Sequence, residues 1–399
     1  MKKKIVVLAY SGGLDTSAII PWIKENYNFD VFAFVADVGQ SRDDLNGIEK
    51  KAISSGAVGC EIIDLKEIFV KNYIYPLLKI GALYEGKYFL GTAIARPIIA
   101  KAQVELAKKI GAQALAHGST GKGNDQVRFE MAYSSLSPEL KVIVPWREWK
   151  FKSREDLLVY LNEKNISTTS TLKKIYSRDE NIWHISTEGG ILEDLWNEPT
   201  KDCWVWTKNV EDSPNIPEYV SLYIENGCIL SINNKFKTPF QCLKELNRLG
   251  SLHGIGRVDI VENRLIGLKS RGCYETPGGT IMYEAIRAIE QLVLDQECMK
   301  WREKLALEMS HVIYNGCWFT PIRKSIQVSS ENLSKMITGT VVLKLYKGMV
   351  CAVKKKSKNS LYSKSFSTFG SDSVYKQSNA SGFINLFSLS SKIRSIKKK

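Results

Sequence analysis

The stretch Ser11-Gly12-Gly13-Leu14-Asp15-Thr16-Ser17 lies between a short apolar run at 5–9 and an apolar-rich stretch at 18–23. The apolar run predicts a buried strand and the second stretch predicts a helix. Glycine lets the backbone turn tightly and approach a phosphate, and a helix N-terminus offers unpaired N–H groups. Hydroxyl groups in the stretch can donate further hydrogen bonds, and Asp15 can hold Mg²⁺ or position the loop. The sequence therefore predicts a phosphate-binding turn here.

The pattern Ser-Gly-Gly-x-Asp-Thr-Ser resembles the loop of the ATP pyrophosphatases, which cleave ATP between the α and β phosphates and pass AMP to a carbonyl-type oxygen. A Walker A loop would need Gly, four residues and then Gly-Lys-Ser/Thr. The segment Gly118-Ser119-Thr120-Gly121-Lys122-Gly123 is too short for that motif and ends differently. The motif therefore favours cleavage at the α-phosphate over transfer of the γ-phosphate.

The composition is that of a globular protein, with 399 residues, 44% hydrophobic and 25% charged, which is enough for two domains. The basic start at 1–4 and the apolar run after it resemble a signal peptide, but the run is too short and leads into polar residues. No stretch approaches eighteen apolar residues. We therefore expect a cytoplasmic protein without a membrane partner, or a stromal one if the gene is encoded in a plastid.

The cysteines, the histidines and the net charge indicate which kinds of site and partner to expect. The eight cysteines include no Cys-x-x-Cys pair and there are four histidines, so we expect reduced thiols and no metal-ligand cluster. The net charge of +14 is concentrated partly at 354–356 and 397–399, without interleaved aromatic residues that would stack on bases. We therefore expect a basic surface suited to anionic substrates and no nucleic-acid partner.

Strand-like and helix-like segments alternate through the first part of the chain, which predicts an α/β fold with a doubly wound parallel sheet and ligands at the carboxyl ends of its strands. Further strands are predicted at 30–36, 61–65, 113–117 and 141–144, and helices at 45–55, 66–80, 93–110 and 153–162. The polar run at 167–171 predicts a crossover. We therefore expect a nucleotide-binding domain at 1–166.

The remainder predicts a mixed α+β domain at 167–369 and a C-terminal segment at 370–399. Helices are expected at 241–249 and 281–307, and a strand pair at 339–346 and 349–354. Residues 370–381 predict a polar loop. Residues 384–396 predict one amphipathic helix that packs on another subunit.

The segment at 117–129 follows a predicted strand, so it should reach the same sheet edge as the Ser11 turn. Its glycines predict a flexible lining that can hold a zwitterion. Arg128 offers a planar fork for a carboxylate, and Asp125 offers an acceptor for an ammonium group. Two more polar segments, at 176–190 and 256–280, are weaker signals, and the histidines in this part of the chain are expected to be structural.

Together these segments resemble the type 1 argininosuccinate synthase family, over nearly the whole chain. The stretches that carry the resemblance are 9–17, 36–40, 84–97, 117–130, 145–149, 176–194 and 253–280. The resemblance implies an ATP-pyrophosphatase domain, similar to adenine-nucleotide hydrolases, a synthetase domain, and a C-terminal helix that helps to form a homotetramer. It implies an arginine-biosynthesis ligase in which ATP adenylates the ureido oxygen of L-citrulline, and the amine of L-aspartate then displaces AMP from citrullyl-AMP, with pyrophosphate released in the first step.

The resemblance also implies site residues. ATP would be bound by Ala9, Tyr10, Ser11, Gly12, Gly13, Leu14, Asp15, Thr16, Ser17, Ala36 and Gly118. Aspartate would be held by Thr120, Asn124 and Asp125, and citrulline by Tyr88, Asn124, Arg128, Ser177, Ser186, Glu262 and Tyr274. The family often has Ser where this chain has Ala93, so a hydroxyl contact is missing there. Asp15 and Lys122 are the candidate catalytic residues, with Lys122 offsetting charge during adenylation.

The sequence leaves two alternative functions open. Another ATP pyrophosphatase, either an amidotransferase-type synthetase or a tRNA-modifying enzyme, would need a catalytic or paired cysteine, and neither is evident. An RNA-binding protein would show steep salt-dependent affinity without turnover.

Overall fold

The computed structural model describes residues 3–121, 123–166, 175–370, 374 and 376–398. A parallel five-stranded sheet forms the first part, in the order β3-β2-β1-β4-β5. Its strands are β1 (Lys4–Ala9), β2 (Phe29–Asp37), β3 (Gly59–Asp64), β4 (Ala114–Ala116) and β5 (Lys141–Ile143). The predicted doubly wound parallel sheet is therefore confirmed, with β1 at its centre.

Both faces of this sheet are covered, because alternate residues of β1 enter different cores. Val6 and Leu8 pack with α1 (Leu14–Tyr27), whereas Val7 packs with α6 (Gly91–Ile110) on the opposite face. Burial on both faces explains why β1 is apolar from Ile5 to Ala9. The other helices of this part are α2 (Arg42–Leu45), α3 (Ile48–Ser54), α7 (Asp125–Leu136) and α8 (Arg154–Glu163).

Two helices differ from the sequence prediction in ways that affect the site. Helix α1 begins directly after Gly13, so Asp15 lies in its first turn rather than at a surface turn. Helix α7 begins at Asp125, where a flexible loop was expected. Asp125 and Arg128 therefore project from one rigid helical turn. The predicted crossover at 167–171 lies outside the described residues.

The second part contains an antiparallel sheet in the order β10-β9-β8-β13-β14. The strands are β8 (Glu218–Glu225), β9 (Cys228–Ile232), β10 (Lys235–Phe236), β13 (Gly339–Tyr346) and β14 (Met349–Lys356), so the predicted C-terminal strand pair is confirmed. Helix α9 (Pro239–Leu252) contacts β9, and α10 (Pro277–Val293) contacts β13 and β14. The prediction of a single helix at 281–307 is wrong. The chain breaks at Leu294, and Asp295 caps α11 (Gln296–Tyr314) by accepting from the Cys298 N–H at 2.8 Å.

A third, antiparallel sheet has the order β11-β12-β7-β6. It is built from β6 (Ser177–Asn181), β7 (His184–Glu188), β11 (Arg257–Asn263) and β12 (Lys269–Glu275). The two weak polar segments of the sequence therefore form strands of one sheet. Its register places Tyr274 opposite Ser186, and Gly272 opposite Glu188.

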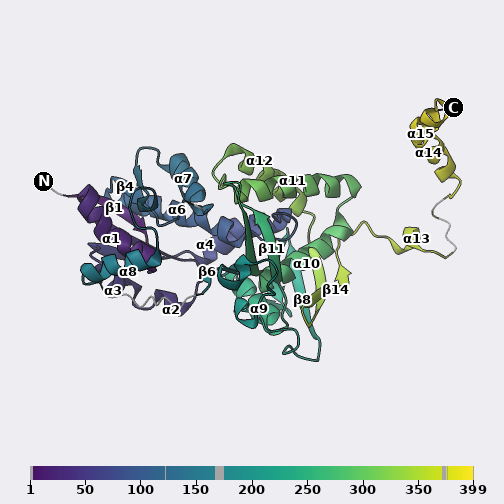
Figure 1. The fold of residues 1–399 in the computed structure, drawn as a ribbon. Coiled ribbons are helices and arrows are strands. Elements are labelled where there is room, and N and C mark those ends of the chain that lie inside the picture. Colours follow the sequence, from purple (N-terminus) through teal and green to yellow (C-terminus); the bar gives the residue numbers. More distant parts are fainter. Residues whose placement is uncertain (1–2, 122, 167–174, 371–373, 375, 399) are drawn as a thin grey trace.

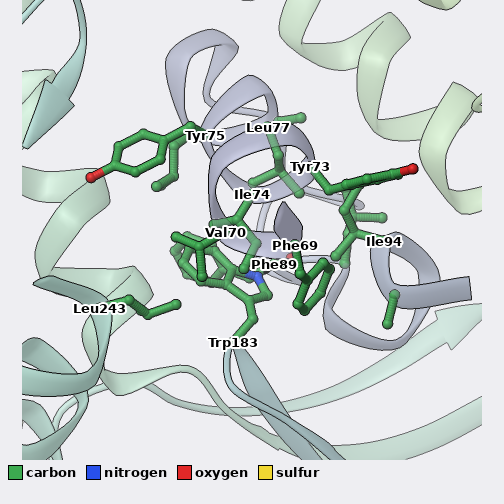
Figure 2. Packing of buried hydrophobic residues seen from close by; sticks show 14 of the residues in the cluster. Phe69, Val70, Tyr73, Ile74, Tyr75, Leu77, Phe89, Ile94, Trp183 and Leu243 are labelled. Atoms are coloured by element: carbon green, nitrogen blue, oxygen red, sulfur yellow. Dashed lines mark hydrogen bonds between the residues drawn. The ribbon is translucent and has the colours of Figure 1, made fainter. Parts of the chain in front are cut away.

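A single hydrophobic core joins the two parts of the molecule. The segment formed by α4 (Lys66–Phe69), a π-helical turn (Val70–Ile74) and α5 (Tyr75–Ile80) lies at its centre and contacts α9, α11 and α12 (Pro321–Ser334). Figure 2 shows Trp183, from the turn between β6 and β7, packed beside Phe89 and Val70 in this core. The indole Nε1 of Trp183 donates to the Phe89 carbonyl at 2.9 Å.

The C-terminal segment leaves the body of the molecule (Figure 1). It contains α13 (Lys364–Ser367), α14 (Asn379–Phe387) and α15 (Leu389–Ile396), so the one amphipathic helix that was expected is two short helices. None of their residues is buried. Among the described helices, none combines the length and apolar character that crossing a membrane requires.

Candidate active site

A cleft of about 1090 Å³ lies between the carboxyl ends of β1 and β4 and the third sheet. Strands β1 and β4 are neighbours, but the connections that leave them run to opposite sides of the sheet, and such a switch point is where doubly wound folds bind ligands. The predicted residues that line the cleft are Ala9, Tyr10, Ser11, Gly12, Gly13, Asp15, Thr16, Ala36, Tyr88, Gly118, Thr120, Asn124, Asp125, Arg128, Ser177, Ser186, Glu262 and Tyr274.

Two predicted residues, Leu14 and Ser17, are not among those lining the cleft. Leu14 is buried in the first turn of α1. The Ser17 side chain is also buried, and its hydroxyl lies 3.1 Å from the Tyr10 hydroxyl. Lys122 lies outside the described residues. The hydroxyl donors available at the turn are therefore Ser11 and Thr16, whose oxygens lie 3.2 Å apart.

The turn after β1 has the geometry of an anion site. Gly12 has a φ of +70°, which an L side chain rarely adopts, and Gly13 is the N-cap of α1. Lys51, from α3, lines the cleft and donates its ammonium to the Gly12 carbonyl at 2.5 Å. Burial raises the pKa of the Asp15 carboxyl, and the positive charge of Arg154 opposes that rise. The turn thus combines N–H donors, a nearby cation and one carboxylate.

The loop after β4 is held against this turn. A side chain at Gly118 would place its Cβ 2.9 Å from Thr16 Cγ2, so only glycine allows this close approach. The Ser119 N–H donates to Nδ1 of the buried His117 at 3.3 Å. On the other side of that ring, Glu130 lies 3.6 Å from Nε2, and His117 together with Arg147 lowers the pKa of Glu130 to about 2. His117 therefore supports the loop rather than facing open solvent.

An ion network joins the two parts of the molecule across the cleft. Arg96 of α6 binds Asp125 at 2.8 Å and Asp179 of β6 at 2.7 Å. Arg128 binds the second oxygen of Asp125 at 2.9 Å. Burial alone would raise the pKa of Asp125, but the two guanidinium groups outweigh it and hold the pKa below its usual value. Asp125 is therefore an ionised acceptor already shared between two cations.

The third sheet contributes a carboxylate, Glu262, to the far side of the cleft. Its Oε1 accepts from the Tyr314 hydroxyl at 2.8 Å, and its Oε2 is buried without a partner among the described residues. Burial raises the pKa of Glu262 to about 7, although the Tyr314 hydrogen bond and Arg128 oppose the rise. A buried, unpaired carboxylate oxygen costs free energy unless a ligand supplies a donor. Oε2 is therefore suited to accept an ammonium group of a ligand.

Two further charged residues of this side were not predicted. Glu188 and Arg264 line the cleft and form an ion pair at 2.5 Å. Burial raises the pKa of Glu188, against the effect of Arg264. This pair borders both the main cleft and a neighbouring pocket of about 550 Å³.

Beneath the site lies a fully buried imidazole, His184. It packs beside the rings of Tyr88 and Tyr274, with ring centroids 5.7 and 5.3 Å away, and those two rings contact each other at 4.6 Å. Neither ring nitrogen has a hydrogen-bond partner in the described part of the chain. Burial lowers the pKa of His184 to about 3. The neutral ring therefore acts as an apolar support for the two tyrosines.

Local motifs could not have identified every residue of the site. Arg96 lies within the stretch 84–97, which carried the family resemblance, so that stretch could have identified it as a site residue. Lys51 and Glu188 have no motif of their own. Tyr314 is the last residue of an ordinary amphipathic helix, and no local signal could have distinguished it.

Comparisons with known proteins agree over the whole chain. The model "Arginosuccinate synthase N-terminal HUP domain" matches residues 5–167, and "Arginosuccinate synthase C-terminal domain" matches residues 176–394. The chain is 69% identical over 393 residues to "Argininosuccinate synthase" of Buchnera aphidicola subsp. Acyrthosiphon pisum (strain Tuc7), covering 98% of each chain. It is 63% identical over 394 residues to the protein of that name from Serratia proteamaculans (strain 568), covering 98% of this chain and 97% of the relative.

Proposed function

This chain belongs to the argininosuccinate synthase family, and we propose that the cleft between its first and third sheets holds all three substrates of that reaction. The chain is a carbon–nitrogen ligase of arginine biosynthesis that uses ATP, citrulline and aspartate. The observation that carries the proposal is the position of the cleft, which has a phosphate-type turn on one side and an unpaired carboxylate oxygen on the other.

We assign the triphosphate to the turn after β1. Backbone N–H groups of Gly12, Gly13 and the first turn of α1 would face phosphate oxygens, and Lys51 would add positive charge beside them. Asp15 is a fitting ligand for Mg²⁺, which usually takes one or two carboxylates together with phosphate oxygens. When bound, that ion would neutralise charge on the departing pyrophosphate.

We assign the amino-acid end of citrulline to the other side of the cleft. The free Oε2 of Glu262 would accept from its ammonium group, and Arg128 would face its carboxylate. Ser177, Ser186 and Tyr274, which lie on neighbouring strands, would bind along its length. Thr120, Asn124 and Asp125 would hold aspartate on the α7 side of the cleft.

The chemistry requires positioning more than proton transfer. A ureido oxygen attacks the α-phosphorus of ATP, the bond to the β-phosphate oxygen breaks, and pyrophosphate leaves. The neutral amine of aspartate then attacks the activated carbon, the C–O bond to AMP breaks, and the nitrogen that has formed the new C–N bond loses a proton. Holding ATP, citrulline and aspartate in line is worth several kcal/mol of the barrier, on the order of 7–11 in favourable cases. Lys51 beside the turn and Arg128 on the citrulline side would offset negative charge on the bound substrates.

The test uses citrulline labelled with ¹⁸O in the ureido group. Incubation with ATP, Mg²⁺ and aspartate should give AMP that carries the label, together with unlabelled pyrophosphate. Formation of ADP and phosphate, or AMP without label, would overturn the proposal. Mass spectrometry of the nucleotide measures both outcomes.

We also propose that the C-terminal helices hold a homotetramer. The exposed apolar side chains of α14 and α15 are Phe383, Ile384, Leu386, Phe387, Leu389, Ile393 and Ile396. Helices this short are marginal in water without a packing surface. Because they lie away from the body of their own chain, a neighbouring subunit is the natural surface for them (Figure 1).

A further inference from the structure

Tyr314, at the end of α11, contacts three cleft residues that lie far from it in the sequence. Its hydroxyl donates to Glu262 Oε1 at 2.8 Å and accepts from Asn124 Nδ2 at 2.9 Å. Its backbone carbonyl accepts from Arg128 Nε at 3.0 Å, and the Arg128 guanidinium lies 4.9 Å from the centre of its ring. One residue therefore holds side chains from β11, from α7 and from the N-cap of α7.

The direction of each hydrogen bond is determined. The Leu265 N–H donates to Asn124 Oδ1 at 3.0 Å, so the amide of Asn124 must present its NH₂ group to Tyr314. Because the Asn124 NH₂ group already donates to the Tyr314 oxygen, the Tyr314 hydroxyl hydrogen is left to point to Glu262 Oε1, which accepts it at 2.8 Å. Burial raises the pKa of Tyr314 far above the physiological range, so the hydroxyl keeps that hydrogen.

The ring of Tyr314 cannot easily turn away from this position. It stacks on Tyr84 with ring centroids 3.6 Å apart and an angle of 5°, and it meets Tyr88 edge-on at 6.5 Å. Only 1% of the residue is exposed. Such packing fixes the hydroxyl in space, so the carboxylate that accepts from it is fixed as well.

We infer that Tyr314 is a positioning residue for the amino-acid end of citrulline. Its hydroxyl occupies one oxygen of Glu262 and leaves the other directed to the ligand, while its carbonyl holds the Arg128 fork. One residue thereby holds both an ammonium acceptor and a carboxylate donor, the two groups that recognition of an α-amino acid requires. This inference rests on the proposed placement of citrulline between Glu262 and Arg128.

The test is Tyr314→Phe, which removes the hydroxyl and retains the ring, its stacking and the backbone carbonyl. We expect the KM for citrulline to rise about tenfold or more, because a hydrogen bond to a charged group is lost. The KM for ATP should stay within about twofold and kcat within about threefold, because neither depends on the hydroxyl in this scheme. The matched control is Tyr84→Phe, which removes a hydroxyl from the stacked partner that donates to the Asn263 carbonyl. That control should leave the KM for citrulline unchanged.

A double variant separates positioning from packing. In a Glu262→Gln background, Tyr314→Phe should raise the KM for citrulline much less than in the wild type, because the carboxylate it positions is gone. Equal effects in both backgrounds, or an equal rise in the KM for ATP, would overturn the inference. If Glu262→Gln raises the KM for citrulline and Tyr314→Phe does not, the inference alone fails. If neither variant changes it, the placement of citrulline itself is wrong.

Discussion

Replacing Arg128 by alanine tests the placement of citrulline most directly. Arg128 is 4% exposed and uses two of its five N–H donors, one on Asp125 and one on the Tyr314 carbonyl. Three donors remain for a ligand carboxylate. The substitution therefore removes from the cleft lining a charged fork that the proposed function needs.

The expected effects of Arg128→Ala on citrulline binding and on the free energy of unfolding can be estimated separately from the contacts of Arg128. Asp125 keeps its contact with Arg96 after the substitution, so its charge stays paired. The unpaired Tyr314 carbonyl costs about 1–3 kcal/mol of stability. Truncating a buried charged partner of a substrate typically costs 2–5 kcal/mol of binding. At about 1.4 kcal/mol for each factor of ten, kcat/KM for citrulline should fall by about 30-fold to 4000-fold.

Steady-state kinetics with each substrate varied in turn measures this loss. Arg128→Ala should raise the KM for citrulline and leave the KM for ATP nearly unchanged, with the folded state verified by thermal unfolding. Arg128→Lys should restore little, because a single ammonium cannot reproduce the planar fork. Arg248→Ala, which removes a surface arginine that pairs with Glu245, is the matched control and should leave the KM for citrulline unchanged.

A different pattern would refute the reasoning. If Arg128→Ala raised only the KM for ATP, the guanidinium would belong to the nucleotide side of the cleft. If Arg128→Lys restored full activity, a point charge would be sufficient, and the argument from fork geometry would be wrong.

Four further outcomes are expected. Asp15→Ala should stop AMP formation without lowering the unfolding temperature, because burial already raises the pKa of that carboxyl; turnover near the wild-type rate would exclude a role in the reaction. Deleting residues 382–399 should lower the oligomer mass in light scattering, and a truncated tetramer of normal mass would contradict the proposed role of the tail. Because His184 has a pKa of about 3 in the folded state and about 6.5 unfolded, unfolding free energy should fall as pH drops from 6.5 to 3, by up to about 1.4 kcal/mol for each pH unit, and urea titration of His184→Asn should lack this part of the slope. Gly91→Ala would place a Cβ 2.0 Å from His184 Cγ and should cost about 1–3 kcal/mol of stability, partly restored by adding His184→Ala; no loss in denaturant melts would show that α6 and β7 can separate freely.

The fold of the first part could be predicted well because its signals are local. The apolar runs that became β1 and β2 are buried on both faces, and the glycines after β1 mark the turn directly. Helix α7 was missed because its sequence has little apolar periodicity and follows a glycine-rich segment. The break between α10 and α11 depends on one capping residue, Asp295, which a long apolar pattern conceals.

Site residues that belong to sequence motifs were predicted, and site residues that reach the cleft only through tertiary contacts were missed. The turn residues Gly12 and Gly13 and the α7 residue Arg128 follow predicted strands, so topology alone brings them to one edge. Tyr314 and Lys51 reach the cleft from elements whose packing no local pattern describes. The contacts of Tyr314 and Lys51 with the cleft become evident only when the positions of α11 and α3 in the fold are known.

The core that α4 and α5 share with the second part of the molecule limits how the enzyme can admit its substrates. Rotating the two parts as rigid bodies would pull Trp183 away from Phe89 and expose both rings. Exposing a large apolar side chain costs roughly 1.5–3 kcal/mol, and many such side chains meet at this boundary. We therefore expect ATP and the amino acids to enter through rearrangement of loops and ion pairs at the cleft mouth, and not through a hinge. The same boundary means that a fragment ending at residue 166 would present an apolar surface to water, so we expect neither half to fold without the other.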